Sequence, residues 1–290
     1  MMIPLQRIVL IGVGLIGGSF VLDLKRKGLV REVAGIDLDA DNLARALERG
    51  VVDSAHTAVQ ADVLAGADLV LLATPVASLP ALCRTLAPLL PDHCLVSDVG
   101  STKQSALAAF AEHLPQHLPR CVAAHPIAGS DRHGALAAQF GLFQDKKLVL
   151  CPHDRQDAAA LARVASLWQA VGAQTCCLSA EEHDAVFAAV SHLPHLLAYS
   201  YMHQVATAAD SAKWLDFAGS GFRDFTRIAA SSPTVWADIT LANRDSLLAL
   251  LSAQQQELAD LQQWLRDGNR AALLDFFRVA SRAREDWQNR

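Results

Sequence analysis

The chain contains few cysteines, and none of them is spaced as a CxxC pair. Six cysteines are spread over 290 residues. This number is too small for a disulfide scaffold, and the spacing suits neither a redox motif nor a structural zinc site. We therefore expect reduced thiols, and with them a cytoplasmic protein.

The charges are nearly balanced. Lysine and arginine number 25 against 30 acidic residues, so the net charge is −5, and charged residues make up only 19% of the chain. Proteins that bind nucleic acids or anionic membranes normally show a basic domain or stripe, which is lacking here. The hydrophobic fraction of 52% is also too high for an intrinsically disordered chain.

No apolar run is long enough to cross a membrane. The longest candidate, residues 8–22, has fifteen uncharged residues behind Arg7, whereas a span needs about 20. Its four glycines and the lack of a small-residue cleavage site nearby argue against a signal peptide. Low-complexity tracts, repeats and Pro/Ser-rich linkers are also lacking, and the length suggests about two domains.

The first part of the chain alternates short apolar runs with helical stretches. This pattern predicts a mostly parallel, doubly wound sheet of the Rossmann type, with helices on both faces. The predicted strands are RIVLIG (7–12), EVAGID (32–37), DLVLLATP (68–75), HCLVSDV (93–99), RCVAAHP (120–126), KLVLCP (147–152) and QTCCLS (174–179). We place the domain boundary where this alternation stops, which gives a first domain over 1–178 and an all-helical domain over 179–290.

The second part shows only helical periodicity. We predict one helix over about 180–209 with a bend near Pro194, a second from Thr234 far into the 260s, and a last one over about 269–287. In the second helix, leucines fall on alternating steps of four and three residues, which forms a heptad-like seam. The seam consists of Leu247, Leu251, Leu258, Leu261 and Leu265. Such a stripe serves either packing within one subunit or a subunit interface.

A glycine fingerprint follows the first predicted strand. Gly12, Gly14 and Gly17 have the GxGxxG spacing, between a strand and an amphipathic helix. The three glycines permit a tight turn, close approach of a pyrophosphate and close packing of helix on strand. We expect the whole GVGLIG segment to contact a nicotinamide dinucleotide, including Val13, Leu15 and Ile16.

The second predicted strand ends at an acidic residue. Asp37 stands twenty residues beyond Gly17, where a carboxylate accepts hydrogen bonds from the adenosine ribose and repels a 2′-phosphate. We therefore expect NAD rather than NADP as the cofactor. A helix cap or turn is the alternative role for this aspartate, since Asp39 and Asp41 lie close by.

Polar residues follow the later strands at the same expected edge of the sheet. Thr74 and Pro75 should border the nicotinamide half of the cofactor, as should the SDVGSTK segment, for which a polar turn is the alternative. His125 follows the next strand and is a candidate general base, although a single histidine is more often structural.

The helical part contributes histidines and arginines. His192 and His195 lie one turn apart in SHLPH, but the sequence has no HExxH and no evident third ligand, so we expect no metal. Arg223 and Arg227 would share a helix face, and an arginine fork suits a carboxylate substrate. We expect Arg223 to be the structural one, paired with Asp224 or capping a helix.

Taken together, these motifs resemble the prephenate dehydrogenase family of tyrosine biosynthesis. The resemblance covers nearly the whole chain through GVGLIGGS, the acidic end of the second strand, ATPV, SDVGSTK, AAHPIAGS, VSHLPH and GFRDFTRIA, in that order. It implies a Rossmann-like domain, an all-helical domain forming an intertwined homodimer, and NAD-dependent oxidative decarboxylation of prephenate to 4-hydroxyphenylpyruvate. It also leads us to expect no chorismate mutase segment before the fingerprint and no regulatory domain after Trp287.

The resemblance also implies roles for single residues. His125 would accept the proton of the ring hydroxyl, and Ser101 would orient that histidine and hydroxyl. His195 would contact the substrate side chain, and Arg227 would bind a carboxylate. Two further residues would shape the pocket, His192 and Trp236. Glycine-richer loops before FRDFTR are common in the family, whereas this chain has AGSG there.

Three other functions remain open. Arogenate dehydrogenase, or a cyclohexadienyl dehydrogenase of dual specificity, shares these motifs. Hydroxyacid dehydrogenases with a Rossmann domain and helices use a catalytic lysine on the helical side, where this chain has only Lys213. A non-catalytic NAD(H) sensor would leave His125, Ser101 and Arg227 without a shared purpose.

Overall fold

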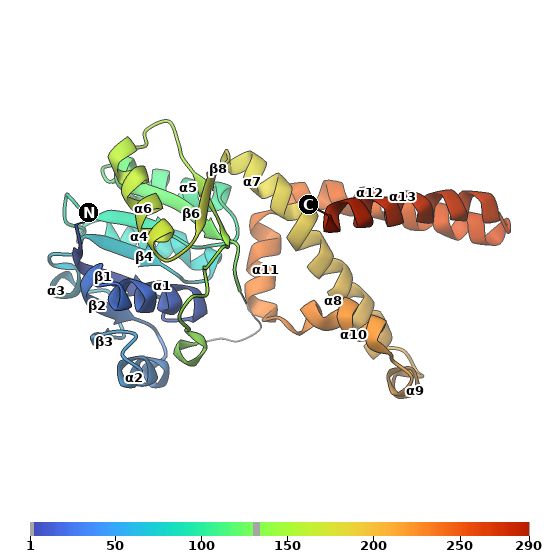
Figure 1. Ribbon diagram of the computed structural model, residues 1–290, viewed down its shortest axis with the longest axis horizontal. Coiled ribbons are helices and arrows are strands. Elements are labelled where there is room, and N and C mark those ends of the chain that lie inside the picture. The colour runs from blue at the N-terminus through green and yellow to red at the C-terminus, as the bar shows by residue number, and fades with distance from the viewer. Residues whose placement is uncertain (1–2, 130–133, 290) are drawn as a thin grey trace. The chain divides into compact units, whose positions relative to one another are not determined.

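The computed structural model describes residues 3–129 and 134–289, so Ser130 of the AAHPIAGS motif lies outside the described residues (Figure 1). The chain separates into two compact units after Asn243, and each is described by itself. Among the described helices, none has the length and apolar character that crossing a bilayer requires.

The first unit is built on one eight-stranded sheet with the order β3-β2-β1-β4-β5-β6-β7-β8. Every neighbouring pair is parallel except β6 and β7, so the predicted mostly parallel sheet is confirmed. The strands are β1 (Leu5–Ile11), β2 (Val30–Ile36), β3 (Ser54–His56), β4 (Leu69–Leu72), β5 (Leu95–Asp98), β6 (Cys121–Pro126), β7 (Lys147–Cys151) and β8 (Gln174–Cys177). All seven predicted strands are present, and β3 is an additional one.

Helices cover both faces of this sheet (Figure 1). One face is covered by α1 (Leu15–Arg26) and α6 (Ala158–Ala170), with α2 (Ala40–Glu48) beside them. The other is covered by α3 (Ala61–Leu64), α4 (Leu79–Leu86) and α5 (Gln104–His113). The rings of Phe20 and Trp168 lie 4.2 Å apart, centroid to centroid, and anchor α1 to α6. Both side chains are fully buried, as a sheet covered on two faces requires.

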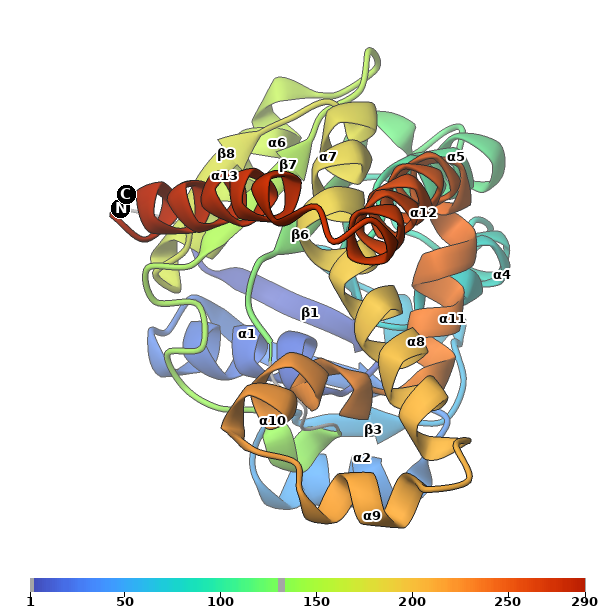
Figure 2. The same cartoon turned by 90° about the vertical axis from the view of Figure 1, so that its right-hand side faces the viewer.

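Helices continue the first unit beyond β8. They are α7 (Ala180–Phe187), α8 (Leu193–Ala206), α9 (Ser211–Asp216), α10 (Ser220–Thr226) and α11 (Pro233–Ala242), with a π-helical turn at Ala188–His192 and a 3₁₀ turn at Arg227–Ala230. The interruption expected near Pro194 is this π-helical turn, which ends two residues before the proline. Helix α8 contacts α10 and the 3₁₀ turn that precedes α11 (Figure 2). The Tyr199 hydroxyl of α8 donates to the carbonyl of Ser231, which directly follows this turn, at 2.6 Å.

The prediction of one continuous helix from Thr234 into the 260s is wrong, because this segment forms two helices. These are α11 and α12 (Arg244–Arg266), and Asn243 between them leaves the helical region at φ −116° and ψ 30°. The Asn243 side chain donates to the Asp184 carbonyl instead, at 2.8 Å. A tertiary hydrogen bond thus outweighs the local helical preference at this residue.

The second unit consists of two helices. Helix α12 is followed by a turn, in which Gly268 has a φ of +59°, and then by α13 (Arg270–Gln288), which confirms the predicted last helix. Trp264 packs on Phe276 at 5.8 Å. Two leucines of the predicted seam are exposed, Leu258 at 55% and Leu265 at 69%.

Candidate active site

The glycine loop between β1 and α1 has the geometry that a dinucleotide requires. Gly12 has a φ of +88°, and a Cβ there would lie 2.4 Å from the Ala73 carbonyl oxygen. A Cβ on Gly17 would lie 2.5 Å from Leu10 Cδ1, which explains the close packing of α1 on β1. A Cβ on Gly14, the N-cap of α1, would meet nothing within 4 Å, so the approach to the helix N-terminus is open.

The loop lies where the strand order reverses. Strand β1 has β2 on one side and β4 on the other, so the carboxyl ends of β1 and β4 flank the switch point where such sheets bind ligands. Thr74 and Pro75 follow β4, and Thr74 Oγ1 accepts a 2.8 Å hydrogen bond from Ser78. Within the loop, Val13 and Leu15 are buried, whereas Ile16 is half-buried.

Asp37 directly follows β2 and is held as an acceptor. Its carboxylate accepts from the Val13 amide at 2.9 Å, the Asp39 amide at 3.1 Å and the Asn42 side chain at 3.2 Å. The capping role belongs to Asp39, whose side chain accepts from the Asn42 amide at the start of α2. The half-buried Asp37 therefore has remaining lone pairs at the crevice, which fits the hydroxyls of a ribose and opposes a phosphate.

A buried ion pair shapes the loop after β5. Lys103 Nζ donates to Asp98 at 2.5 Å and to the Ala124 carbonyl at 2.6 Å, and both charged side chains are fully buried. Ala124 precedes His125, so this pair ties the SDVGSTK loop to the end of β6. Ser101 lies half-buried in that loop, and no hydrogen bond from its hydroxyl to His125 is present among the described residues.

His125 is hydrogen-bonded to residues that the sequence analysis missed. Its Nδ1 lies 2.8 Å from His183 Nε2, and His183 Nδ1 lies 2.8 Å from Asp184 Oδ1. Phe187 packs against both histidine rings, at 4.8 Å and 4.5 Å. Both missed residues are in the AEEHDAVF helix, where adjacent charged residues resemble a solvated face, so the sequence contains no signal of their burial.

The other predicted pocket residues gather around one indole. The His195 ring stacks on Trp236 at 3.5 Å, and the His192 ring meets the same indole edge-on at 6.0 Å. His195 Nδ1 donates to the Ser191 carbonyl at 2.9 Å, which leaves Nε2 as an acceptor. His192 Nδ1 accepts from Asn243 at 3.1 Å, so its Nε2 carries the proton; this atom is buried and has no partner within the described residues.

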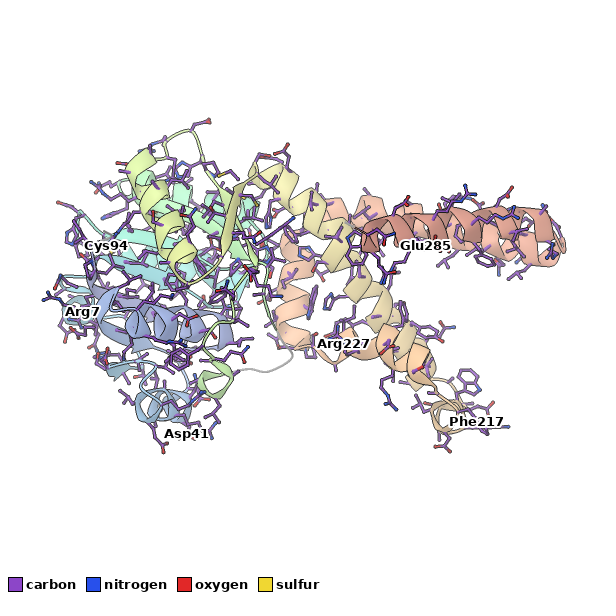
Figure 3. All side chains as sticks on the ribbon, in the orientation of Figure 1. Arg7, Asp41, Cys94, Phe217, Arg227 and Glu285 are labelled. Carbon is purple, nitrogen blue, oxygen red and sulfur yellow. The ribbon has the colours of Figure 1, made fainter. Side chains whose placement is uncertain are left out.

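Arg227 begins the turn between α10 and α11 (Figure 3). Its side chain is exposed, and within the described ranges it forms no ion pair. The expected pairing of Arg223 with Asp224 is not found there either. Arg227 is close enough to His195 for its charge to contribute to lowering the histidine's pKa. The guanidinium therefore lies near the histidines and is available to a carboxylate.

Three histidines of the site, His125, His192 and His195, favour their neutral forms. Burial, followed by the charge of Lys103 and by His183 and His192, lowers the pKa of His125 well below 6.5. Burial lowers the pKa of His192 to about 4, and it also lowers that of His195. A neutral imidazole accepts protons, so His125 is suited to act as a base at neutral pH.

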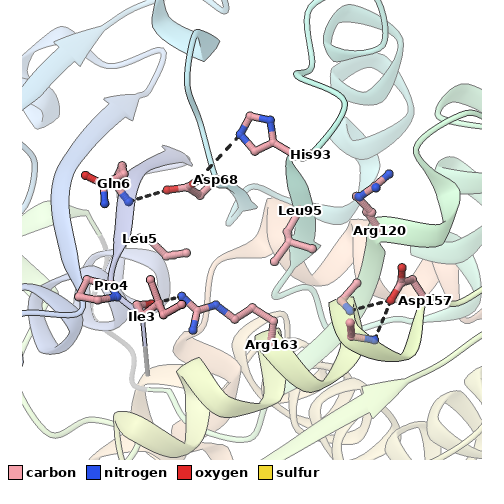
Figure 4. A pocket seen from close by; sticks show the side chains of 12 residues that line it. Ile3, Pro4, Leu5, Gln6, Asp68, His93, Leu95, Arg120, Asp157 and Arg163 are labelled. Atoms are coloured by element: carbon pink, nitrogen blue, oxygen red, sulfur yellow. Dashed lines mark hydrogen bonds and ion pairs between the residues drawn. The ribbon is translucent and has the colours of Figure 1, made fainter. Parts of the chain in front are cut away.

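The described residues offer no metal site, and a large cavity that they line lies away from His125. They contain no group of three or more His, Cys, Asp or Glu side chains able to hold a metal ion. A cavity of about 580 Å³ lies at the amino ends of β1 and β5, lined by Gln6, Asp68, His93 and Arg120 among others (Figure 4). That edge is opposite to the one with His125 and the glycine loop, and the cavity includes no predicted site residue.

Comparison with known proteins identifies the family. The family model for the prephenate dehydrogenase nucleotide-binding domain matches residues 20–177, and the model for the prephenate dehydrogenase dimerization domain matches residues 179–279. A prephenate dehydrogenase of Bacillus subtilis is 34% identical over 96% of this chain and 75% of its own length. A cyclohexadienyl dehydrogenase of Zymomonas mobilis is also 34% identical, over 96% of this chain and 95% of its own.

A solved structure agrees with these relatives. The prephenate dehydrogenase of A. aeolicus, in complex with hydroxyphenyl propionate and NAD+, superposes with a TM-score of 0.91 at 29% identity, and 99% of each chain is covered. Two domain models in order, relatives along nearly the full chain and a shared fold lead to one conclusion: this chain belongs to the prephenate dehydrogenase family.

Proposed function

We propose that this protein catalyses the NAD-dependent oxidative decarboxylation of prephenate to 4-hydroxyphenylpyruvate in tyrosine biosynthesis. The observation that carries the proposal is a neutral, half-buried His125 at the carboxyl end of β6, in the same sheet edge as the glycine loop. A base beside a dinucleotide site is the combination that oxidation of a ring carbinol needs.

His125 Nε2 takes the proton of the ring hydroxyl as the carbinol C–H bond breaks. NAD, when bound, supplies the hydride acceptor. Loss of carbon dioxide then makes the ring aromatic, and the phenolate oxygen takes the proton back from His125. The proton balance on the protein therefore closes, and the gain in aromaticity makes the overall reaction effectively irreversible, so the protein mainly positions the substrate and provides one base.

The other site residues have binding roles in this proposal. Arg227 binds a carboxylate of the dianionic substrate, since its guanidinium is exposed and forms no ion pair with the residues that the structure describes. His195 and His192, held around Trp236, line the substrate pocket. Ser101 contacts the ring hydroxyl. The glycine loop, Asp37, Thr74 and Pro75 hold the cofactor.

The assembly and domain organisation are also part of the proposal. We place a nucleotide-binding domain over 1–178 and a helical substrate and dimerisation domain over 179–290, with a homodimer formed through the helical half. The match of residues 179–279 to a dimerization domain and the exposed leucines of α12 support the homodimer. A cytoplasmic location stays a prediction from composition.

Absorbance of NADH tests the function directly. Purified protein with NAD and prephenate should form one NADH and one 4-hydroxyphenylpyruvate per prephenate consumed, and arogenate should react far more slowly. NADH formation with arogenate but not with prephenate would assign the chain to the arogenate alternative. Tight NADH binding without turnover of either compound would identify a sensor instead.

A further inference from the structure

Asp184 is a buried carboxylate held in its ionised, acceptor-only form. Its Oδ1 accepts from the Lys103 amide at 2.8 Å, and its Oδ2 accepts from the Gln104 amide at 3.0 Å, at the start of α5. Burial raises its pKa, but the hydrogen bonds from His183 and from these two amides outweigh burial, and the pKa lies below its ordinary value. The dipole of α5 also stabilises the negative charge of this carboxylate, because Asp184 lies at the N-terminus of that helix.

The ionised carboxylate determines which ring nitrogens carry protons. Because a carboxylate only accepts, His183 Nδ1 must donate to Asp184 Oδ1 across 2.8 Å. In a singly protonated His183, Nε2 is then an acceptor, so His125 Nδ1 donates to it across 2.8 Å. The lone pair of His125 is thereby left on Nε2, the atom to which the proposed function assigns proton transfer.

We infer that His183 and Asp184 are positioning residues that fix the tautomer of His125 and stabilise the proton it accepts. When Nε2 of His125 gains the hydroxyl proton, its Nδ1 proton can move to His183 Nε2. The positive charge then lies beside the Asp184 carboxylate rather than near Lys103, and the protons return along the same path. The expected effect of these residues on the reaction rate rests on the proposed function, whereas the assignment of the His125 tautomer does not.

Steady-state kinetics test the rate effect. Asp184→Asn replaces one acceptor oxygen by a donor amide, so we expect kcat for prephenate to fall about 10–1000-fold with KM within about threefold. His183→Gln keeps an acceptor for His125 and should lose less activity than His183→Leu. Asp23→Asn is the matched control, since Asp23 is 4% exposed and accepts only from the Gly141 amide within the described chain. It should leave kcat and its pH profile unchanged.

Nuclear magnetic resonance of histidine ring nitrogens tests the tautomer without any substrate. In the whole protein labelled with ¹⁵N-histidine, and with the His125 signal assigned from His125→Asn, His125 should be protonated at Nδ1 only. In Asp184→Asn this state should be lost or mixed, whereas Asp23→Asn should keep it. The proposal is overturned if wild-type His125 is protonated at Nε2, if Asp184→Asn leaves the tautomer unchanged, or if its kcat matches that of the control.

The two readouts separate this inference from the proposed function. A wild-type protein that forms no NADH from prephenate, but shows the predicted tautomer, refutes the function and leaves the tautomer assignment standing. A wild-type protein that turns over prephenate, with Asp184→Asn and His183→Leu equally active, keeps the function and refutes the inference.

Discussion

At the scale of single residues, the neighbouring aspartates Asp37 and Asp39 have different tasks because their carboxylates accept hydrogen bonds from different backbone amides. Asp37 accepts from the Val13 amide and lies in the crevice, whereas Asp39 caps α2. The sequence left these two tasks open between neighbouring aspartates. The structure separates them, because only Asp37 contacts the glycine loop.

Replacement of Asp37 should therefore change the choice of cofactor. Asp37→Ser removes a charged acceptor from the ribose, so NAD should bind more weakly by about 1.5–3 kcal/mol, and NADP should be used better. The ratio of kcat/KM for NAD to that for NADP measures this change independently of any general weakening of the loop. Asp39→Asn, which keeps the helix cap, should leave the ratio unchanged. Equal use of both cofactors by the wild type would refute the assignment.

Replacement of Arg227 should affect binding more than turnover. The substrate carboxylate is charged before and during the reaction, so Arg227→Ala should raise KM for prephenate with little change in kcat. Because Arg227 is exposed, we expect a loss of about 1.5–3 kcal/mol rather than the larger value for a desolvated pair. Arg223→Ala is the control and should keep the wild-type KM. An Arg227→Ala enzyme with a normal KM would show that the carboxylate binds elsewhere.

At the scale of elements, helix α7 carries His183 and Asp184, the two residues hydrogen-bonded in sequence to His125. The N-terminus of this helix is well capped. Ser179 and Glu182 form a reciprocal capping box, with hydrogen bonds of 3.1 Å and 3.0 Å between side chains and amides. The helix therefore begins at a defined residue, which fixes the positions of His183 and Asp184 one turn later.

Loss of this cap should lower the stability of the protein. Ser179→Ala should reduce the free energy of unfolding by about 0.5–2 kcal/mol, measured by urea titration at one fixed protein concentration. Glu182→Gln should have little effect, because glutamine also fits a capping box. Identical urea midpoints for wild type and Ser179→Ala would contradict this account of α7.

The elements predictable from sequence are those whose burial appears as an apolar pattern. Seven strands were predicted because each carries an apolar run, whereas β3 consists of Ser54, Ala55 and His56 and has none. The break at Asn243 was missed because its cause is a hydrogen bond to a residue 59 positions away. His183 and Asp184 were missed for the same reason, since only tertiary contacts bury them. The predicted roles of the site residues stay predictions.

At the scale of the whole molecule, the exposed leucines of α12 predict a homodimer. Leu258 and Leu265 lie on one side of the helix, and an exposed apolar stripe of this kind commonly marks an interface. Light scattering at micromolar concentration should give about twice 31.1 kDa. Leu265→Glu should weaken the dimer, whereas Ala253→Glu, an exposed position on the other side of α12, should not. A stable, fully active wild-type monomer would refute the dimer.

The central claim is that His125 takes the hydroxyl proton as hydride leaves the substrate, and kcat for prephenate as a function of pH tests it most directly. Wild-type kcat should be constant near pH 7 and fall only at a pH below the ordinary histidine range, because the lowered pKa keeps His125 neutral and able to accept a proton. His125→Asn should lower kcat about 10²–10⁴-fold, remove this fall and leave KM nearly unchanged. A His125→Asn enzyme with near-normal kcat for both prephenate and arogenate would contradict the account, because the base would then be another residue.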